Sequence, residues 1–365
     1  EVKWSYNQRN RTVKLNIEQK QDLSKTKLFS MPVDIRVDDK LHTIWVDEKE
    51  MTYELPVDVR PKMVIFNAGM RIPCKVTFNK PLSEWILQLE KGPHILDRVA
   101  AINVLKNKKG RRNVENAFLG SIESDPFWGV RKEAVQAFAS LRLKQHSDKL
   151  MKLSEGQDNR VRRAIWRALR NYKKDSDVST FLQNIVSTDS KYYSVSDAFR
   201  ALVAVDTAAA RKKVDALLIR DSHQDVIRSA AISYFGRVKN DQNYDRLKEL
   251  ASYGGTTWDA RPEAVSQLSQ YAKERKETLD IFVDLLKDKS RDVRRRAVFA
   301  LASHGNKTHL GHLDEILYND PALGRDIRYA KKRIISPPKK RPKTSTEKEL
   351  DEANRRLDEI KRILD

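Results

Sequence analysis

The segment Asp292-Val293-Arg294-Arg295-Arg296-Ala297 is one copy of a motif, Asp-x-Val-Arg-x-Ala with drift, that recurs along most of the chain. The copies align on Arg98, Arg131, Arg162, Ser196, Arg228, Arg261, Arg294 and Arg328, in steps of 33, 31, 34, 32, 33, 33 and 34 residues. A period near 33 that recurs in this way is typical of a solenoid, because each helix pair can bury its apolar face only against its neighbours. The repeat therefore predicts an α-solenoid of HEAT-like helix pairs. An ankyrin array is excluded, since no Thr-Pro-Leu-His turn occurs.

Each residue of the motif has a physical role in such an array. An Asp just ahead of a helix caps its first free amides, and a small Ala lets adjacent helices approach. An Arg can reach the Asp or the helix end of a neighbouring unit. We expect ladder-like contacts between successive repeats from Arg131, Arg162, Arg228, Arg261, Arg294 and Arg328. We expect these arginines to pair with acids that stand where a helix cap is expected, such as Asp125, Asp158, Asp225 and Asp292.

From Glu1 to about Pro81 the apolar residues alternate with a period of two, which places one row of side chains on one face of a strand. The rows are Val2, Trp4, Tyr6; Val13, Leu15, Ile17; Val33, Ile35, Val37; and Ile72, Cys74, Val76, Phe78. Turn residues separate the rows, so we predict roughly seven short strands in an antiparallel β-sandwich. After Pro81 the apolar period becomes helical.

These changes predict a multi-domain β + α chain in three parts: a β-sandwich domain over 1–81, a HEAT-like helical repeat domain over 82–330 and a tail over 331–365. Residues 331–343 of the tail carry seven positive charges and no acid around Pro337-Pro338, which is typical of an extended linker. Beyond it the apolar residues step by three and four and predict a short amphipathic helix: Leu350, Ala353, Leu357, Ile360 and Leu364.

Composition excludes several classes of protein. The 365 residues are 39% hydrophobic and 33% charged, too apolar for a disordered chain, and no stretch is long and apolar enough for a membrane span. Cys74 is the one cysteine, so neither a disulfide framework nor a four-cysteine zinc site can form within the chain. The compartment stays open between cytoplasm and periplasm, because we expect any signal peptide to precede this segment.

The sequence shows no catalytic constellation. It has no H-E-x-x-H, G-x-S-x-G, P-loop or dinucleotide fingerprint, so we expect no catalytic, cofactor-binding or metal-binding residue in this chain. The nearest metal candidate is His304, His309 and His312, but Gly305-Asn306 marks this segment as a turn between helices, where polar residues are expected. For Cys74, which alternates with Ile72 and Val76, we expect a buried small apolar residue.

The net charge of +20 raises the alternative of a nucleic-acid-binding array. Residues 1–90 account for +2 and residues 331–365 for +5, which leaves +13 on the repeats. Because the arginines recur at one position in each unit beside a capping Asp, we expect them to serve contacts between repeats. Nucleic acid is therefore not the partner that we expect.

The order of the parts resembles the C-terminal region of gluzincin zinc aminopeptidases of the aminopeptidase N type, a β-sandwich followed by a helical domain. The segment from Lys14 to Gln21, before Leu28-Phe29-Ser30-Met31-Pro32-Val33-Asp34-Ile35, is similar to that family's Gln-x-Gln and Phe-x-x-Pro-Val-Asp-Ile pattern. Lys75 to Lys80, followed by Glu84, Gln88-Leu89 and Arg98 to Ala101, is similar to its junction with the helical domain. The resemblance covers the chain up to about Ala330.

This resemblance implies a non-catalytic region that packs on its own N-terminal catalytic domain and limits the access of peptide substrates to the cleft. The parent protein would be a zinc metallopeptidase, with the zinc in the catalytic domain and none in this chain. The family's zinc ligands, catalytic Glu and Gly-x-Met-x-Asn motif have no match here. The same arrangement also occurs in a transcription-factor subunit of inactive-peptidase descent, so a HEAT-repeat scaffold or binding module stays the alternative.

Overall fold

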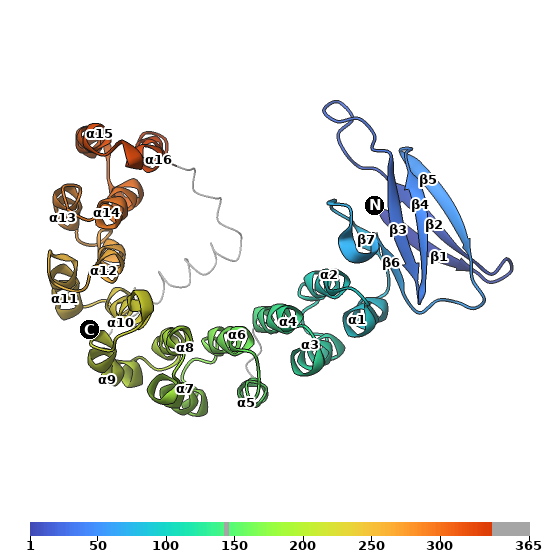
Figure 1. The fold of residues 1–365 in the computed structure, drawn as a ribbon, viewed down its shortest axis with the longest axis horizontal. Helices are drawn as coiled ribbons and strands as arrows, with labels where there is room; N and C mark the ends of the chain where they lie inside the picture. The colour runs from blue at the N-terminus through green and yellow to red at the C-terminus, as the bar shows by residue number, and fades with distance from the viewer. Residues whose placement is uncertain (142–145, 338–365) are drawn as a thin grey trace, which may run out of the picture. The chain divides into compact units, whose positions relative to one another are not determined.

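The computed structural model describes residues 1–141 and 146–337. The chain divides between Tyr234 and Phe235 into two compact units. The first unit contains strands β1–β7 and the helices from α1 into α10, and the second contains the remaining helices to α16 (Figure 1). None of the described helices combines the length and the apolarity that a membrane crossing needs.

The N-terminal strands form two sheets. Their bounds are β1 Val2–Asn7, β2 Thr12–Glu18, β3 Met31–Val37, β4 Lys40–Val46, β5 Glu50–Pro56, β6 Val64–Phe66 and β7 Phe78–Asn79. One sheet has the order β5-β2-β1-β7 and the other β4-β3-β6. The pairs β1–β2, β2–β5, β3–β4 and β3–β6 are antiparallel. The prediction of an antiparallel sandwich is wrong only for β7, which pairs with β1 in parallel.

The core of this β domain is built from the alternating residues that the sequence indicated. Val13, Leu15 and Ile17 of β2 are buried, as are Val33 and Ile35 of β3. The other buried members of the cluster are Val2, Val37, Ile44, Val46, Leu55 and Val64. One apolar face of each strand is therefore enough to fill the core of the β domain.

The strand expected from Ile72 to Phe78 is mostly absent, and only Phe78–Asn79 pairs with β1. The Asn67 side chain explains the difference, since its Oδ1 accepts from Ile72 N at 3.1 Å and its Nδ2 donates to Ile72 O at 2.7 Å. These are the backbone groups that a neighbouring strand would have to bond. Cys74 is consequently exposed, and the expectation that it is a buried apolar residue is wrong.

Within the described residues, helices follow from Leu82 onward as eight successive pairs. Their bounds are α1 Leu82–Lys91, α2 Ile95–Leu105, α3 Arg112–Ser124, α4 Trp128–Ser140, α5 Ser147–Lys152, α6 Asn159–Leu169, α7 Ser176–Thr188, α8 Tyr192–Val205, α9 Thr207–Leu218, α10 Val226–Arg237, α11 Asp241–Ala251, α12 Arg261–Leu268, α13 Thr278–Leu285, α14 Arg291–His304, α15 Leu310–Asn319 and α16 Gly324–Ile335. Short 3-10 helices lie at Ala68–Met70 (η1), His223–Asp225 (η2), Ser269–Tyr271 (η3), Lys307–His309 (η4) and Pro321–Leu323 (η5). A β domain followed by an α-solenoid is therefore the fold of this chain.

The second helix of each pair carries the repeat motif and packs against its counterparts. In the first unit α4 contacts α2 and α6, and α6 contacts α8; in the second unit α14 contacts α12 and α16. The motif alanines are all buried: Ala101, Ala134, Ala164, Ala198, Ala230, Ala264, Ala297 and Ala330. A larger side chain at these positions would push neighbouring helices apart, which explains why alanine recurs at this position of every repeat.

Four motif arginines form contacts between successive repeats: Arg162, Arg261 and Arg294 of the expected set, together with Arg98. Their acid partners differ from those expected, except for Asp125. Each arginine reaches an Asp that follows the first helix of the next pair, 26 or 27 residues further along the chain. The pairs are Arg98–Asp125, Arg162–Asp189, Arg261–Asp288 and Arg294–Asp320. Because the same aspartates accept backbone amides at the start of the following helix, as Asp125 does from Phe127 N at 2.9 Å, each rung also fixes a turn.

Three of the six expected arginines, Arg131, Arg228 and Arg328, differ from the expectation. Arg228 pairs locally with Asp225 and Asp221. Arg131 donates to Asp125 O at 2.6 Å, while Asp158 is held by Arg160. For Arg328 the described residues supply no acidic partner in a further repeat, since α16 is the last described helix.

The four expected helix caps are only partly present. Asp158 caps α6 by accepting from Arg160 N at 2.8 Å, and Asp125 binds the turn before α4. Asp292 lies inside α14, whose cap is Ser290. Asp225 lies in η2, where it is engaged by Arg228. The motif thus marks the start of each second helix without fixing which residue caps it.

Helix α16 continues to Ile335, so the first five residues of the expected tail are helical. The amphipathic helix predicted from Leu350 to Leu364 lies outside the described residues.

Candidate functional site

A buried polar network joins the sheets to the first helix pair. Helix α1 places Glu84 and Gln88 one turn apart, so both side chains lie on the same face of the helix. Both residues are nearly inaccessible, at 4% and 2% exposure. This polar pair lies on a face that a soluble helix would normally fill with apolar residues, and each group therefore needs a partner.

Glu84 binds three groups, two from strands of the β domain and one from the segment between β7 and α1. Its Oε2 accepts from Trp4 Nε1 at 3.1 Å, and its Oε1 accepts from Val64 N at 2.8 Å. The ammonium group of Lys80 lies 3.3 Å from Oε1. One carboxylate thereby ties β1, β6 and the entry into α1 together.

Lys80 is the cation of this network, and its side chain is fully buried. Its Nζ donates to Val64 O at 2.8 Å and to Gln88 Oε1 at 2.6 Å, and lies 4.3 Å from the centre of the Trp85 ring. Burial in this apolar setting lowers the pKa of Lys80 to about 8, and the charge of Glu84 opposes that shift. The ammonium is held without contact with solvent.

A cavity of about 440 Å³ lies next to this network. Its apolar lining includes Ile65, Met70, Val76, Phe78, Trp85 and Val104, and its polar lining includes Asn67, Gln88, Asp97 and Asn103. A volume of several hundred Å³ with an apolar lining and a few polar groups is typical of small-molecule sites.

Asp97 is the charged residue of the cavity lining, and it is 1% exposed. It lies in the first turn of α2, where the helix N-terminus favours a negative charge. Its Oδ1 accepts from Gly69 N at 2.7 Å, but its buried Oδ2 has no partner among the described residues. A buried carboxylate oxygen without a partner is costly, so this atom is the polar group of the network that a donor would stabilise.

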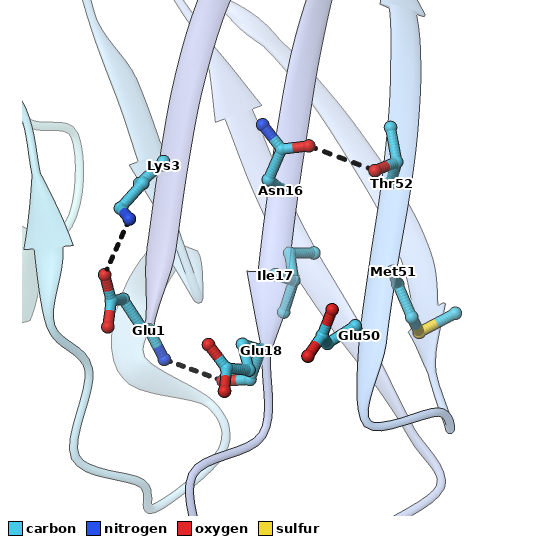
Figure 2. Close-up of a pocket in the computed structure, with 8 residues that line it drawn as sticks. All are labelled: Glu1, Lys3, Asn16, Ile17, Glu18, Glu50, Met51 and Thr52. Carbon is cyan, nitrogen blue, oxygen red and sulfur yellow. Dashed lines mark hydrogen bonds and ion pairs between the residues drawn. The ribbon is translucent and has the colours of Figure 1, made fainter.

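A second hollow, of about 240 Å³, lies on the four-stranded sheet among β1, β2 and β5 (Figure 2). It is lined by Glu1, Lys3, Asn16, Ile17, Glu18, Glu50, Met51 and Thr52. Glu1 pairs with Lys3 at 3.1 Å and Glu18 with Lys20 at 2.7 Å. Because lysines already neutralise these carboxylates at the surface, this hollow is the weaker candidate.

The histidines considered at the sequence level serve a turn. His309 Nδ1 accepts from Asn306 N at 3.2 Å within a capping box at η4, and His304 ends α14. Over residues 1–141 and 146–337, no group of three His, Cys, Asp or Glu side chains is arranged to hold a metal ion.

Sequence reasoning missed the network around Lys80, Glu84 and Asp97. A signal was present, because Glu84 and Gln88 are spaced like the apolar residues Trp85 and Leu89 of the same helix. Charged and amide residues in a helix usually face solvent, so the spacing alone did not identify Glu84 and Gln88 as buried.

Comparison with known proteins supports the repeat assignment. A family model for HEAT repeats matches residues 82–170 and 115–203. The helical part is an array of HEAT-like repeats. No curated protein matches the sequence.

Similar solved structures include the following three. Legionella pneumophila aminopeptidase A in complex with aspartic acid has 12% identity and a TM-score of 0.49 over 89% of this chain, which spans 43% of that protein. The CpcE–CpcF complex of phycocyanin lyase from Nostoc has 16% identity and a TM-score of 0.40, with coverage of 67% and 97%. Human deoxyhypusine hydroxylase in complex with glycerol has 14% identity and a TM-score of 0.33, with coverage of 70% and 94%.

Proposed function

We propose that this chain is the non-catalytic C-terminal region of a zinc aminopeptidase of the aminopeptidase N type. In this proposal the chain packs on the peptidase domain of its own parent protein and limits which peptides reach the cleft. The zinc and the catalytic residues belong to that domain, and this chain supplies neither.

The observation that carries the proposal is that residues of the Gln-x-Gln segment, which resembles the family, bind the loop before β3. Gln19 is buried, and its Nε2 donates to Phe29 O at 2.9 Å and to Glu48 O at 3.1 Å. Its Oε1 accepts from Phe29 N at 3.1 Å. Gln21 adds a bond to Lys27 O at 3.3 Å. The Gln-x-Gln segment therefore fixes the loop that leads into β3, which gives the two resembling segments one shared structural purpose.

The junction supports the role of a fixed wall. Glu84 and Lys80 hold β1, β6 and α1 together by buried hydrogen bonds, so the first repeats have a defined position on the β domain. A helical array that is attached rigidly can restrict access to a neighbouring cleft, whereas one on a flexible linker cannot. Buried charge networks of this kind are strongly weakened when one member is removed.

The ladder gives less support to the nucleic-acid alternative. Arg98, Arg162, Arg261 and Arg294 each bind an aspartate of the adjacent repeat. These guanidinium groups are already neutralised, and a phosphate backbone would have to compete with that pairing.

The test uses the complete product of the gene that contains this sequence. We expect it to contain about one zinc ion per chain and to release the N-terminal residue from aminoacyl p-nitroanilides. We expect a chelator to abolish the activity and zinc to restore it. A complete product that holds no zinc and hydrolyses no N-terminal residue would contradict the proposal and favour the scaffold.

A further inference from the structure

We propose that the cavity beside α1 and α2 is a binding site for a small organic cation, a primary ammonium group attached to an apolar body. The ammonium group would bind Asp97 Oδ2, and the apolar body would lie among Met70, Phe78 and Trp85. This site does not depend on the proposed function.

The charge balance of the buried groups favours a cation. Three ionisable side chains lie together: Lys80, Glu84 and Asp97, with one positive and two negative charges. The ammonium group of Lys80 donates to Gln88 Oε1 and Val64 O and pairs with Glu84. It makes no hydrogen bond to Asp97 Oδ2, which has no partner among the described residues. A ligand with one positive charge makes the cluster neutral and removes the cost of an unpaired buried carboxylate.

The hydrogen-bonding inventory specifies a donor. Gln88 already has partners at both ends of its amide, since its Nε2 donates to Asp97 O at 2.7 Å and its Oε1 accepts from Lys80. The Asn67 amide is occupied by both backbone groups of Ile72. A ligand in this cavity therefore meets an unpartnered acceptor at Asp97, and a carboxylate ligand would be repelled there.

The remaining lining determines the body of the ligand. The ring of Trp85 and the side chains of Met70, Val76 and Val104 present apolar surface around a volume of about 440 Å³. That volume accommodates an aromatic amine of ordinary size, whereas a bare ammonium or metal ion would leave the apolar surface uncovered.

The experiment measures the binding of 2-phenylethylamine by titration calorimetry at pH 7, with 2-phenylethanol and 3-phenylpropionate as ligand controls. We expect the amine to bind, because its positive charge neutralises the buried carboxylate. We expect the alcohol, which donates a hydrogen bond but carries no charge, to bind about tenfold or more weakly, and the negatively charged carboxylate ligand to give no signal. Equal binding of the amine and the alcohol would overturn the site.

Two variants test the assignment within the protein. Asp97→Asn keeps an oxygen for Gly69 N but removes the charge, and we expect it to weaken amine binding about tenfold or more. Ala100→Leu narrows the cavity and leaves the carboxylate in place, so we expect it also to reduce binding. The matched control is Asp58→Asn, at a carboxylate whose side chain is 91% exposed. Amine binding that both cavity variants leave unchanged, or a cavity that takes up water only, would overturn the proposal.

Discussion

Arg98 and Asp125 are 27 residues apart and are joined by two parallel hydrogen bonds, Nε to Oδ2 at 2.7 Å and Nη2 to Oδ1 at 3.1 Å. The third bond of Arg98, from Nη1 to Gly92 O at 2.9 Å, holds the turn within its own repeat. One side chain therefore connects the turn of one helix pair to the turn of the next. Both members are buried, so the pair is a structural connection between repeats.

Arg98→Ala leaves Asp125 buried without its cation, and we expect a loss of about 3 to 5 kcal/mol in the free energy of unfolding. Arg131→Ala, at the equivalent position of the next repeat, removes a bond to a backbone carbonyl and is the matched comparison, with an expected loss of about 1 kcal/mol. Urea unfolding gives both values. Equal losses in the two variants would argue against the ladder as the source of the stability.

Gln19→Ala removes two hydrogen bonds to Phe29 in the loop before β3 and one to Glu48 O, and we expect this loop to open more often. The amide of Phe29 should exchange its hydrogen about tenfold faster or more, since a lost hydrogen bond is worth about 1 kcal/mol. Gln21→Ala is the comparison with a smaller expected effect, because it removes bonds to Lys27 O and Gln19 Oε1 but leaves both bonds between Gln19 and Phe29. Unchanged exchange at Phe29 in Gln19→Ala would show that the loop is held by other contacts.

Lys80 makes the stability depend on pH. Its pKa is lowered from 10.5 to about 8, so between these values the unfolded chain binds more protons than the folded chain. The free energy of unfolding should therefore rise with pH across this window, by at most about 1.4 kcal/mol per pH unit. We expect Lys80→Met to remove this rise between pH 8 and 9.5.

Urea unfolding at several pH values measures how the free energy of unfolding changes with pH. The measurement has to stop below about pH 9.5, for the following reason. Burial raises the pKa of Tyr172 to about 12, which lowers stability above about pH 10 and would mask the contribution of Lys80. An identical slope in Lys80→Met and the unaltered protein below pH 9.5 would contradict the assignment.

Arg160 is the main cause of the low pKa of Asp158, which is about 2. Arg160→Ala should raise the pKa of Asp158, but to a value still below 3.8, because the backbone amide at 160 and the charge of Arg131 remain. A carbon-detected NMR titration of the Asp158 carboxyl measures this change. A pKa that stays at about 2 would show that Arg160 is not the principal partner.

The fold was largely predictable because it rests on periodic signals. Alternation placed Val13, Leu15 and Ile17 in the core of the sandwich, and the step near 33 located the second helix of each pair. The acid partners expected from the sequence were mostly wrong, since the arginines bind Asp189, Asp288 and Asp320 of the next repeat. Helix capping was the wrong criterion for Asp292, which lies inside α14 while Ser290 caps that helix.

The candidate site was not predictable for a physical reason. Its members come from three separate segments, near Val64, from Lys80 to Gln88 and near Asp97, and no single period connects these segments. The alternation from Ile72 to Phe78 predicted a strand, but the Asn67 side chain occupies the backbone groups of Ile72 and leaves room for the cavity. A side chain that substitutes for a strand partner is invisible to a pattern of apolar residues.

The central claim is that this region acts as a wall that restricts substrates of a zinc aminopeptidase. The most direct measurement is kcat/KM of the complete gene product on peptides of increasing length that share one N-terminal residue. The same measurement is made on the Glu84→Gln variant, which weakens the junction, and on the surface control Asp58→Asn. The account predicts that kcat/KM falls with length in the unaltered protein and the control, and that the fall is shallower when the junction is weakened. Hydrolysis that is indifferent to peptide length in all three proteins, or no hydrolysis at all, would contradict it.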